Sequence, residues 1–144
     1  MEKIIQEKTS ADHLLYVSLK YTKTTDVILN LLERWKNLIE ICLNKMLEKA
    51  RKKKLIKNIP SAPKLKIEKC KELFKKNKEI IDVIELFEFF KRIPLKEKLR
   101  ENEFRKNVTL RVLDRGQWVA IDMEKLKEYN EMIERFIREI KQLI

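Results

Sequence analysis

A near absence of turn-forming residues constrains the fold of this chain more than any other feature. Gly116 is the only glycine among the 144 residues, and Pro60, Pro63 and Pro94 are the only prolines. Folds of many strands need frequent turns, and glycine and proline supply a large share of them. Because 44% of the residues are hydrophobic, the chain can still bury a sizeable core. The sequence therefore predicts one domain, 1–144, of mainly helical fold.

The first part of the chain carries apolar residues at helical spacing. We expect a helical region at 10–56, in which Thr9 or Ser10 caps a helix that runs from Ala11 to about Ala50. Its apolar stripe contains Leu14, Val17, Tyr21, Ile28, Leu31, Trp35, Leu38, Cys42 and Met46. The stripe keeps its phase through the threonines of residues 22–25, which favours one long helix and leaves two helices with a break as the alternative. A continuous helix would be about 60 Å long, and dimerisation would cover it.

The positions of the prolines predict how the middle of the chain is organised. The two prolines of NIPSAPK lie in a predicted linker at 57–65, and a second helical region is expected at 66–106. Pro94 interrupts this region. The stretch LKEKLRENEFRK, which begins at Leu95, is interpreted as a shorter helix after that interruption.

The stretch VTLRVLDRGQWVAID alternates apolar and polar residues and predicts a β-hairpin at 107–122. A three-residue turn with Gly116 in the left-handed region would place Leu113 opposite Gln117. This register puts Trp118 opposite Val112 on the apolar face. An isolated hairpin is marginally stable in water, so it must pack on the helices or pair with the edge of another chain.

The hairpin is followed by the most regular apolar stripe of the sequence. It predicts a helix at 123–144, with Asp122 as its cap and Ile121 packed on Leu126. The fold class is therefore an all-α bundle with one β-hairpin in the C-terminal half and a long first helix.

Candidate catalytic and metal-binding residues are few. His13 is the only histidine, which excludes a zinc site of two histidines, and a surface or hydrogen-bonded role is expected for it. Cys42 and Cys70 lie on apolar stripes and are predicted to be buried, reduced thiols. Trp35 and Trp118 are in phase with apolar faces and are predicted to pack in the core. We expect no metal and no cofactor.

The location of the protein is inferred from what the sequence lacks. It shows neither a signal peptide nor a long uncharged apolar run, so we expect a cytoplasmic protein with no membrane partner. The abundance of lysine and glutamate over glutamine is typical of thermophilic sources.

One segment supplies the whole net charge of +11. Residues 45–78 carry fourteen basic and three acidic side chains, whereas residues 1–44 carry six of each kind and residues 79–144 carry fourteen of each kind. Such a block attracts polyanions, and RNA is the natural candidate in a cytoplasm. The predicted contacts are Lys49, Arg51, Lys52, Lys53, Lys54, Lys57, Lys69, Lys71, Lys75 and Lys76. A solvated surface without a ligand is the structural alternative.

The stretch LRENEFRKNVTL resembles small archaeal helical proteins of the HEPN superfamily. The resemblance implies a dimeric helical bundle that cleaves RNA through an arginine and a histidine. In this sequence, those positions are Arg100 and Asn107. An amide cannot act as a general base as an imidazole does. The resemblance therefore implies either a ribonuclease or an inactive relative of one.

Two functions follow from these observations. The first is a non-catalytic, homo-oligomeric interaction module, which binds RNA or another polyanion through residues 49–78, or a protein partner. The alternative is a metal-independent ribonuclease of HEPN type, or its inactive relative, with Arg100 and Asn107 at a dimer interface.

Overall fold

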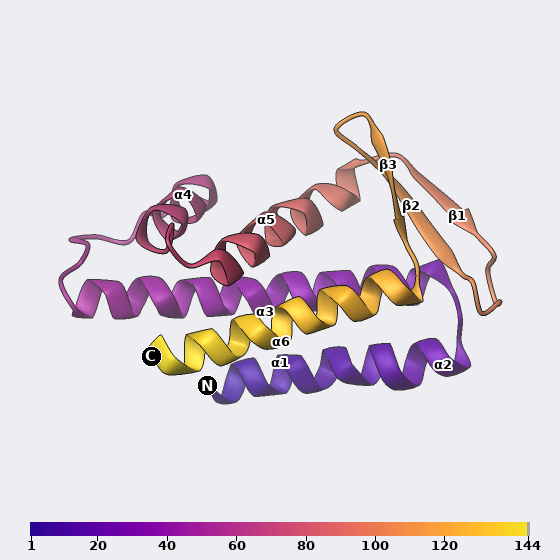
Figure 1. The fold of residues 1–144 in the computed structure, drawn as a ribbon, viewed down its shortest axis with the longest axis horizontal. Helices are drawn as coiled ribbons and strands as arrows, with labels where there is room; N and C mark the ends of the chain where they lie inside the picture. The colour runs from indigo at the N-terminus through magenta and orange to yellow at the C-terminus, as the bar shows by residue number, and fades with distance from the viewer. Residues whose placement is uncertain (144) are drawn as a thin grey trace.

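The computed structural model describes residues 1–143 and confirms a helical bundle with a small antiparallel sheet at one end (Figure 1). Residue 144, the last of the predicted C-terminal helix, lies outside the described residues. The helices are α1 (Glu2–His13), α2 (Leu19–Tyr21), α3 (Thr25–Lys52), α4 (Pro63–Leu73), α5 (Lys78–Arg92) and α6 (Met123–Leu143). The strands are β1 (Lys98–Glu101), β2 (Thr109–Asp114) and β3 (Gln117–Ile121), in the order β1-β2-β3. A π-helical turn, Leu14–Ser18, joins α1 to α2, and a 3₁₀ turn, Ile93–Leu95, follows α5.

The long helix is α3, with 28 residues, and the chain breaks before it at residues 22–24. The break is the alternative that the sequence left open, and the favoured continuous helix is corrected to two antiparallel segments that lie side by side (Figure 1). Because α1 covers α3 within the same chain, the argument for dimerisation from a bare 60 Å helix no longer holds.

Side chains from a distant loop stabilise the break at the start of α3. The Thr24 hydroxyl accepts a hydrogen bond from the Val27 N–H at 3.3 Å, as an N-cap does. The Glu103 carboxylate accepts a second one from the Thr25 N–H at 2.8 Å. Arg100 donates to the Asp26 carboxylate at 2.5 Å. The first two contacts satisfy backbone N–H groups that a continuous helix would have paired internally.

The N-terminal helix begins earlier than predicted and buries other residues. It starts at Glu2, so Thr9 and Ser10 lie inside α1 and cap nothing. The buried side chains are Ile4 and Ala11 in α1, Leu15 in the turn after it and Leu19 in α2, whereas the predicted positions Val17 and Tyr21 are exposed. The π-helical turn at Leu14–Ser18 changes the helical phase, which a stripe of constant period cannot reproduce.

The helical region expected at 66–106 ends at Arg92, and the predicted helix from Leu95 is wrong. Residues 98–101 form β1, which pairs antiparallel with β2 in the register Leu99↔Arg111. Leu95, Leu99 and Phe104, the apolar residues of the predicted helix, are all exposed. A third strand stabilises the hairpin, which alone would be marginal.

The hairpin itself is confirmed, but its register differs by one residue from the prediction. Arg115 and Gly116 have φ of 53° and 78°, so they form a two-residue turn with both central residues in the left-handed region. Asp114 therefore pairs with Gln117, and Leu113 with Trp118. This register moves Trp118 to the outer face of the sheet, where it is 43% exposed, and its predicted place in the core is wrong.

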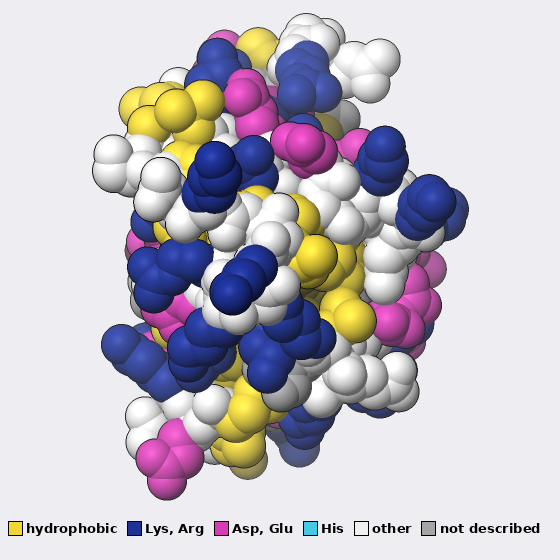
Figure 2. Space-filling view, turned by 90° about the vertical axis from the view of Figure 1, so that its left-hand side faces the viewer, with side chains coloured by type: hydrophobic (Ala, Val, Ile, Leu, Met, Phe, Trp, Pro, Cys, Tyr) yellow, Lys and Arg dark blue, Asp and Glu magenta, His cyan; other side chains and the backbone are white. Residues whose placement is uncertain are grey.

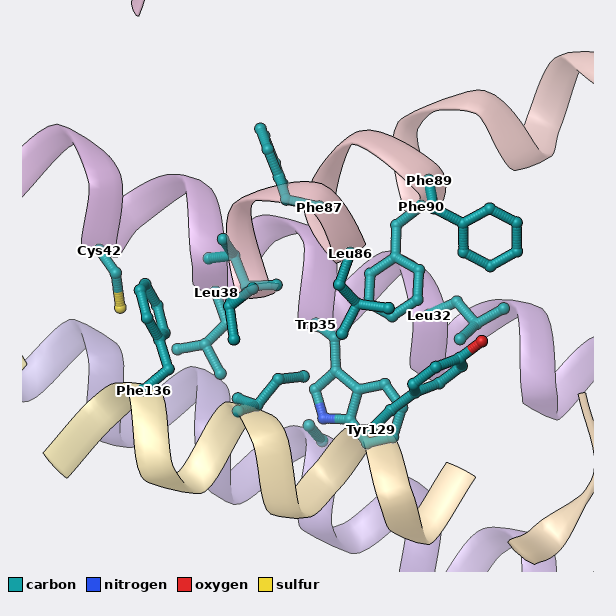
Figure 3. Close-up of a cluster of buried hydrophobic side chains, with 14 of the residues drawn as sticks. Leu32, Trp35, Leu38, Cys42, Leu86, Phe87, Phe89, Phe90, Tyr129 and Phe136 are labelled. Atoms are coloured by element: carbon teal, nitrogen blue, oxygen red, sulfur yellow. The ribbon is translucent and has the colours of Figure 1, made fainter. Parts of the chain in front are cut away.

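The core lies between α3, α5 and α6, with Trp35 at its centre (Figure 3). The Trp35 ring stacks on Phe90 with centroids 6.3 Å apart and meets Tyr129 edge-on at 6.5 Å. Both predicted thiols are buried and free, and burial raises the pKa of Cys42 and of Cys70 to about 12. The thiols are therefore protonated at neutral pH and pack as small apolar groups.

The predicted entry into the last helix is confirmed. The Asp122 carboxylate accepts a hydrogen bond from the Lys125 N–H at 2.9 Å, and Ile121 and Leu126 are both fully buried. Within residues 1–143, no helix has both the length and the apolar character needed to cross a membrane.

Candidate nucleic-acid interface

The basic segment forms one end of the bundle, the end farthest from the sheet (Figure 1). Three parts of the chain contribute: the last turns of α3, the connection at residues 53–62, and α4 with the turn that follows it. We call this surface the basic end. Figure 2 looks onto it and shows Lys and Arg side chains gathered around exposed hydrophobic ones.

The ten predicted contact residues differ in solvent exposure and in whether they form ion pairs. Seven are exposed: Arg51, Lys52, Lys53, Lys54, Lys57, Lys75 and Lys76. Lys69 and Lys71 are half-buried and paired, with Glu72 at 3.7 Å and Glu88 at 2.6 Å. Among residues 1–143, Lys49 and the seven exposed residues make no ion pair. The free charge is therefore concentrated where α3 ends and in the turn after α4.

Two basic residues of α4 were not among the predicted contacts, namely Lys66, which is half-buried and donates a hydrogen bond to the Asn44 side chain, and Lys64. Lys64 is exposed in the first turn of α4 and, within the described chain, has no acidic partner. The charge count over residues 45–78 includes it, and this was the only signal in the sequence that could have identified it.

The end of α3 has a backbone geometry that glycine would suit. The Leu55 N–H donates to the Ala50 carbonyl at 2.9 Å and the Lys54 N–H to the Arg51 carbonyl at 3.0 Å, the two bonds of a Schellman motif. Lys54 occupies its left-handed position with φ 61°. The positive charges here also favour the negative end of the helix dipole, so part of the basic end stabilises the helix itself.

Replacing Lys54 with glycine should therefore stabilise the protein. Glycine adopts positive φ without the steric cost of a Cβ atom, so we expect a gain of about 1 kcal/mol in the free energy of unfolding. Urea denaturation measures it. Lys57→Gly is the matched control, because Lys57 is exposed on the same connection and its φ is not positive. An equal gain in both variants would show that loss of a like charge, not backbone strain, is responsible.

Arg100 and Asn107 do not lie on a helix. Arg100 belongs to β1, and its guanidinium donates to Asp26 and, at 3.2 Å, to the Thr25 hydroxyl. The Asn107 carbonyl accepts hydrogen bonds from the Thr109 hydroxyl and from the Asn102 amide in the loop after β1. Arg100 thus has a structural partner at the start of α3, and the resemblance to HEPN proteins stays a prediction.

His13 lies in an open, polar cleft between α1 and α3. The cleft is also lined by Ser10, Asn30, Glu33 and Arg34. The histidine is exposed, and within residues 1–143 no group of three or more His, Cys, Asp or Glu side chains could hold a metal ion. Among the described residues, no hydrogen bond links His13 to Ser10 or to Glu33.

No family model, curated protein or solved structure matches this chain. The functional argument therefore rests on the residues and geometry described above.

Proposed function

We propose that this protein is a non-catalytic, cytoplasmic interaction module that binds RNA or a similar polyanion through its basic end. The observation that carries the proposal is that eight predicted contact cations on one end of the bundle make no ion pair among residues 1–143. Unpaired surface cations release counterions from a phosphate backbone on binding, which supplies affinity without sequence preference.

The arrangement of the basic end favours contact with a phosphate backbone over recognition of bases. Phe74 is the only aromatic residue between Lys45 and Lys78, and it is half-buried beside Leu73 in the turn after α4. Since few rings are offered to bases, the expected binding is electrostatic and strongly dependent on salt.

The test is the triple charge reversal Lys52→Glu, Lys53→Glu and Lys54→Glu. Fluorescence anisotropy of a labelled RNA across a salt series should show weaker binding for the variant at every salt concentration. If the three lysines contact phosphates of a single strand, the slope of log K against log salt should become about 2 smaller in magnitude.

The matched control reverses Lys127, Arg135 and Arg138 on the exposed face of α6, which changes the net charge equally. An equal loss of affinity in both variants would show that net charge, and not the basic end, attracts RNA. Unchanged affinity and slope after reversal of Lys52, Lys53 and Lys54 would refute the proposal.

The same samples test the two other predictions that the sequence raised. Fragments on a gel in the absence of metal would favour the ribonuclease alternative. Light scattering gives the mass of the protein in solution, alone and mixed with a protein partner. This mass decides whether the protein self-associates.

A further inference from the structure

The sheet end of the molecule presents two aromatic rings to solvent. Tyr21, the last residue of α2, is 79% exposed, and Phe104, in the loop of residues 102–107 between β1 and β2, is 75% exposed. The Phe104 N–H donates to the Lys23 carbonyl at 2.6 Å, so this loop lies against the connection between α2 and α3 (Figure 1). The two rings therefore come from segments that touch each other at one end of the bundle.

The backbone around Phe104 is strained and firmly held. Phe104 has φ 66° and Asn102 has φ 57°, and a bulky side chain rarely adopts the left-handed region. Hydrogen bonds from Arg105 N–H to the Asn102 carbonyl at 3.1 Å and from Val108 N–H to the Arg105 carbonyl at 3.0 Å fix the loop. Core packing does not offset this strain, because the Phe104 ring is exposed to solvent. Strain of this kind is typical of functional positions.

Positive charge lies next to the two rings in the sequence, and the Lys20 Nζ is 5.9 Å from the centroid of the Tyr21 ring. Four nearby cations make no ion pair among residues 1–143: Lys20, Lys23, Arg105 and Lys106. The local acids are already engaged, because Asp26 pairs with Arg100 and the Glu103 carboxylate accepts the Thr25 N–H. The sheet end thus combines exposed rings with cations that make no ion pair among residues 1–143, a combination that the basic end lacks.

This combination fits a particular class of ligand. Single-stranded nucleic acid offers unpaired bases, which stack on exposed aromatic rings, beside phosphates, which attract cations. A protein partner would prefer a continuous apolar patch. Here, lysines and arginines stand next to both rings in the sequence, as Lys20, Arg105 and Lys106 show.

We propose that the loop at residues 102–107 and the α2–α3 connection form a stacking site for unpaired bases of single-stranded nucleic acid. Phe104 and Tyr21 are the platforms, and Lys20, Lys23, Arg105 and Lys106 contact phosphates. This site goes beyond the proposed function, since it lies at the other end of the molecule and binds unpaired bases as well as phosphates.

The experiment compares three labelled probes of equal length: a single-stranded uridine oligomer, its abasic counterpart and an RNA duplex. The test variant combines Phe104→Asn, which tolerates positive φ, with Tyr21→Ala. We expect its affinity for the uridine oligomer to fall about tenfold or more, as loss of base stacking predicts. Binding of the abasic oligomer and of the duplex should stay within about twofold of the wild type.

Two further variants keep the result interpretable. Phe104→Tyr retains the ring and should bind the uridine oligomer as the wild type does. Leu95→Ala removes an exposed apolar side chain that lies outside the site and should have no effect. Circular dichroism confirms that each variant folds.

The outcomes separate this site from the basic end. Reversal of Lys52, Lys53 and Lys54 should weaken the binding of all three probes, and this loss reports on the basic end alone. Unchanged binding of the uridine oligomer by the ring variant would overturn the stacking site, even if the basic end binds RNA. An equal loss for the abasic oligomer would overturn it as well, because the rings would then act without bases.

Discussion

Replacing Trp35 with alanine should lower the free energy of unfolding by about 3–5 kcal/mol, the cost of removing a large buried side chain whose cavity does not collapse. Trp35 is fully buried, and its ring stacks on Phe90 of α5 and meets Tyr129 of α6 edge-on. Its loss therefore loosens α3 from two helices at once. Urea denaturation followed by circular dichroism measures the change, because this signal does not depend on the tryptophan removed.

The other tryptophan provides a matched control for this substitution. Trp118→Ala removes the same side chain from the outer face of the sheet, where 43% of it is exposed, and should cost much less. Trp35→Phe should also be milder than Trp35→Ala, since the indole N–H has no hydrogen-bond partner among residues 1–143. Equal losses for Trp35→Ala and Trp118→Ala would contradict the assignment of Trp35 as the centre of the core.

The second large effect concerns the ion pair that joins α5 to the hairpin. Arg92 donates two hydrogen bonds to the Asp114 carboxylate, at 2.9 and 3.0 Å, and Asp114 is only 9% exposed. Asp114→Asn keeps the shape of the side chain but removes its charge. We expect a loss of about 2 kcal/mol at pH 7, in the range for hydrogen bonds between charged groups.

This loss should depend on pH in one direction. The hydrogen bonds from Arg92 lower the pKa of Asp114 below its usual value, so the folded state favours the carboxylate. The stabilisation is complete above the unfolded pKa of about 3.9 and is lost as the pH falls through the lower, folded value. Denaturation curves should therefore show a constant difference between wild type and Asp114→Asn from about pH 5 to 8, which shrinks below about pH 4.

Asp26→Asn is the matched control for the pH series. Asp26 pairs with Arg100 at the surface, so the same substitution should change stability little at any pH. A difference for Asp114→Asn that persisted unchanged to pH 2 would show that its cost does not come from the carboxylate charge.

The sequence correctly predicted those features of the fold that are determined by residues close together in the chain. Asp122 caps α6 through a hydrogen bond to a residue three positions later, and Trp35 lies on a stripe that α3 keeps over its whole length. The hairpin followed from alternation around the single glycine. Its register did not, because Arg115 adopts positive φ with no asparagine or glycine to signal it.

The errors share a long-range cause. The break before α3 is signalled locally only by its threonines, of which Thr24 is the N-cap, and its second capping group is the distant Glu103. The strand β1 exists because β2 offers it an edge, which the residues of β1 do not record. Leu95 and Leu99 have helical spacing, but a helix there would have left the hairpin with two strands.

The two candidate surfaces differ in whether the sequence alone reveals them. The basic end was visible in the sequence because its charges are contiguous in the chain. The cations of the sheet end were hidden, since residues 1–44 and residues 79–144 each carry equal numbers of both signs. Only the fold shows that Asp26 and Glu103 are engaged, and that Arg105 and Lys106 make no ion pair within the part of the chain that the structure describes.

The capping of α3 by Glu103 also has a consequence for the order of events during synthesis. The N-terminal half leaves the ribosome first, but its second capping group, Glu103, lies 78 residues further along the chain, and the ring partners of Trp35 are at positions 90 and 129. Until those residues emerge, only the Thr24 cap favours the bend before α3, and the interior around Trp35 is incomplete. The nascent chain should therefore sample a straight helix through Thr22, and native structure should form late and as a unit, when β1 and α6 reach the first half.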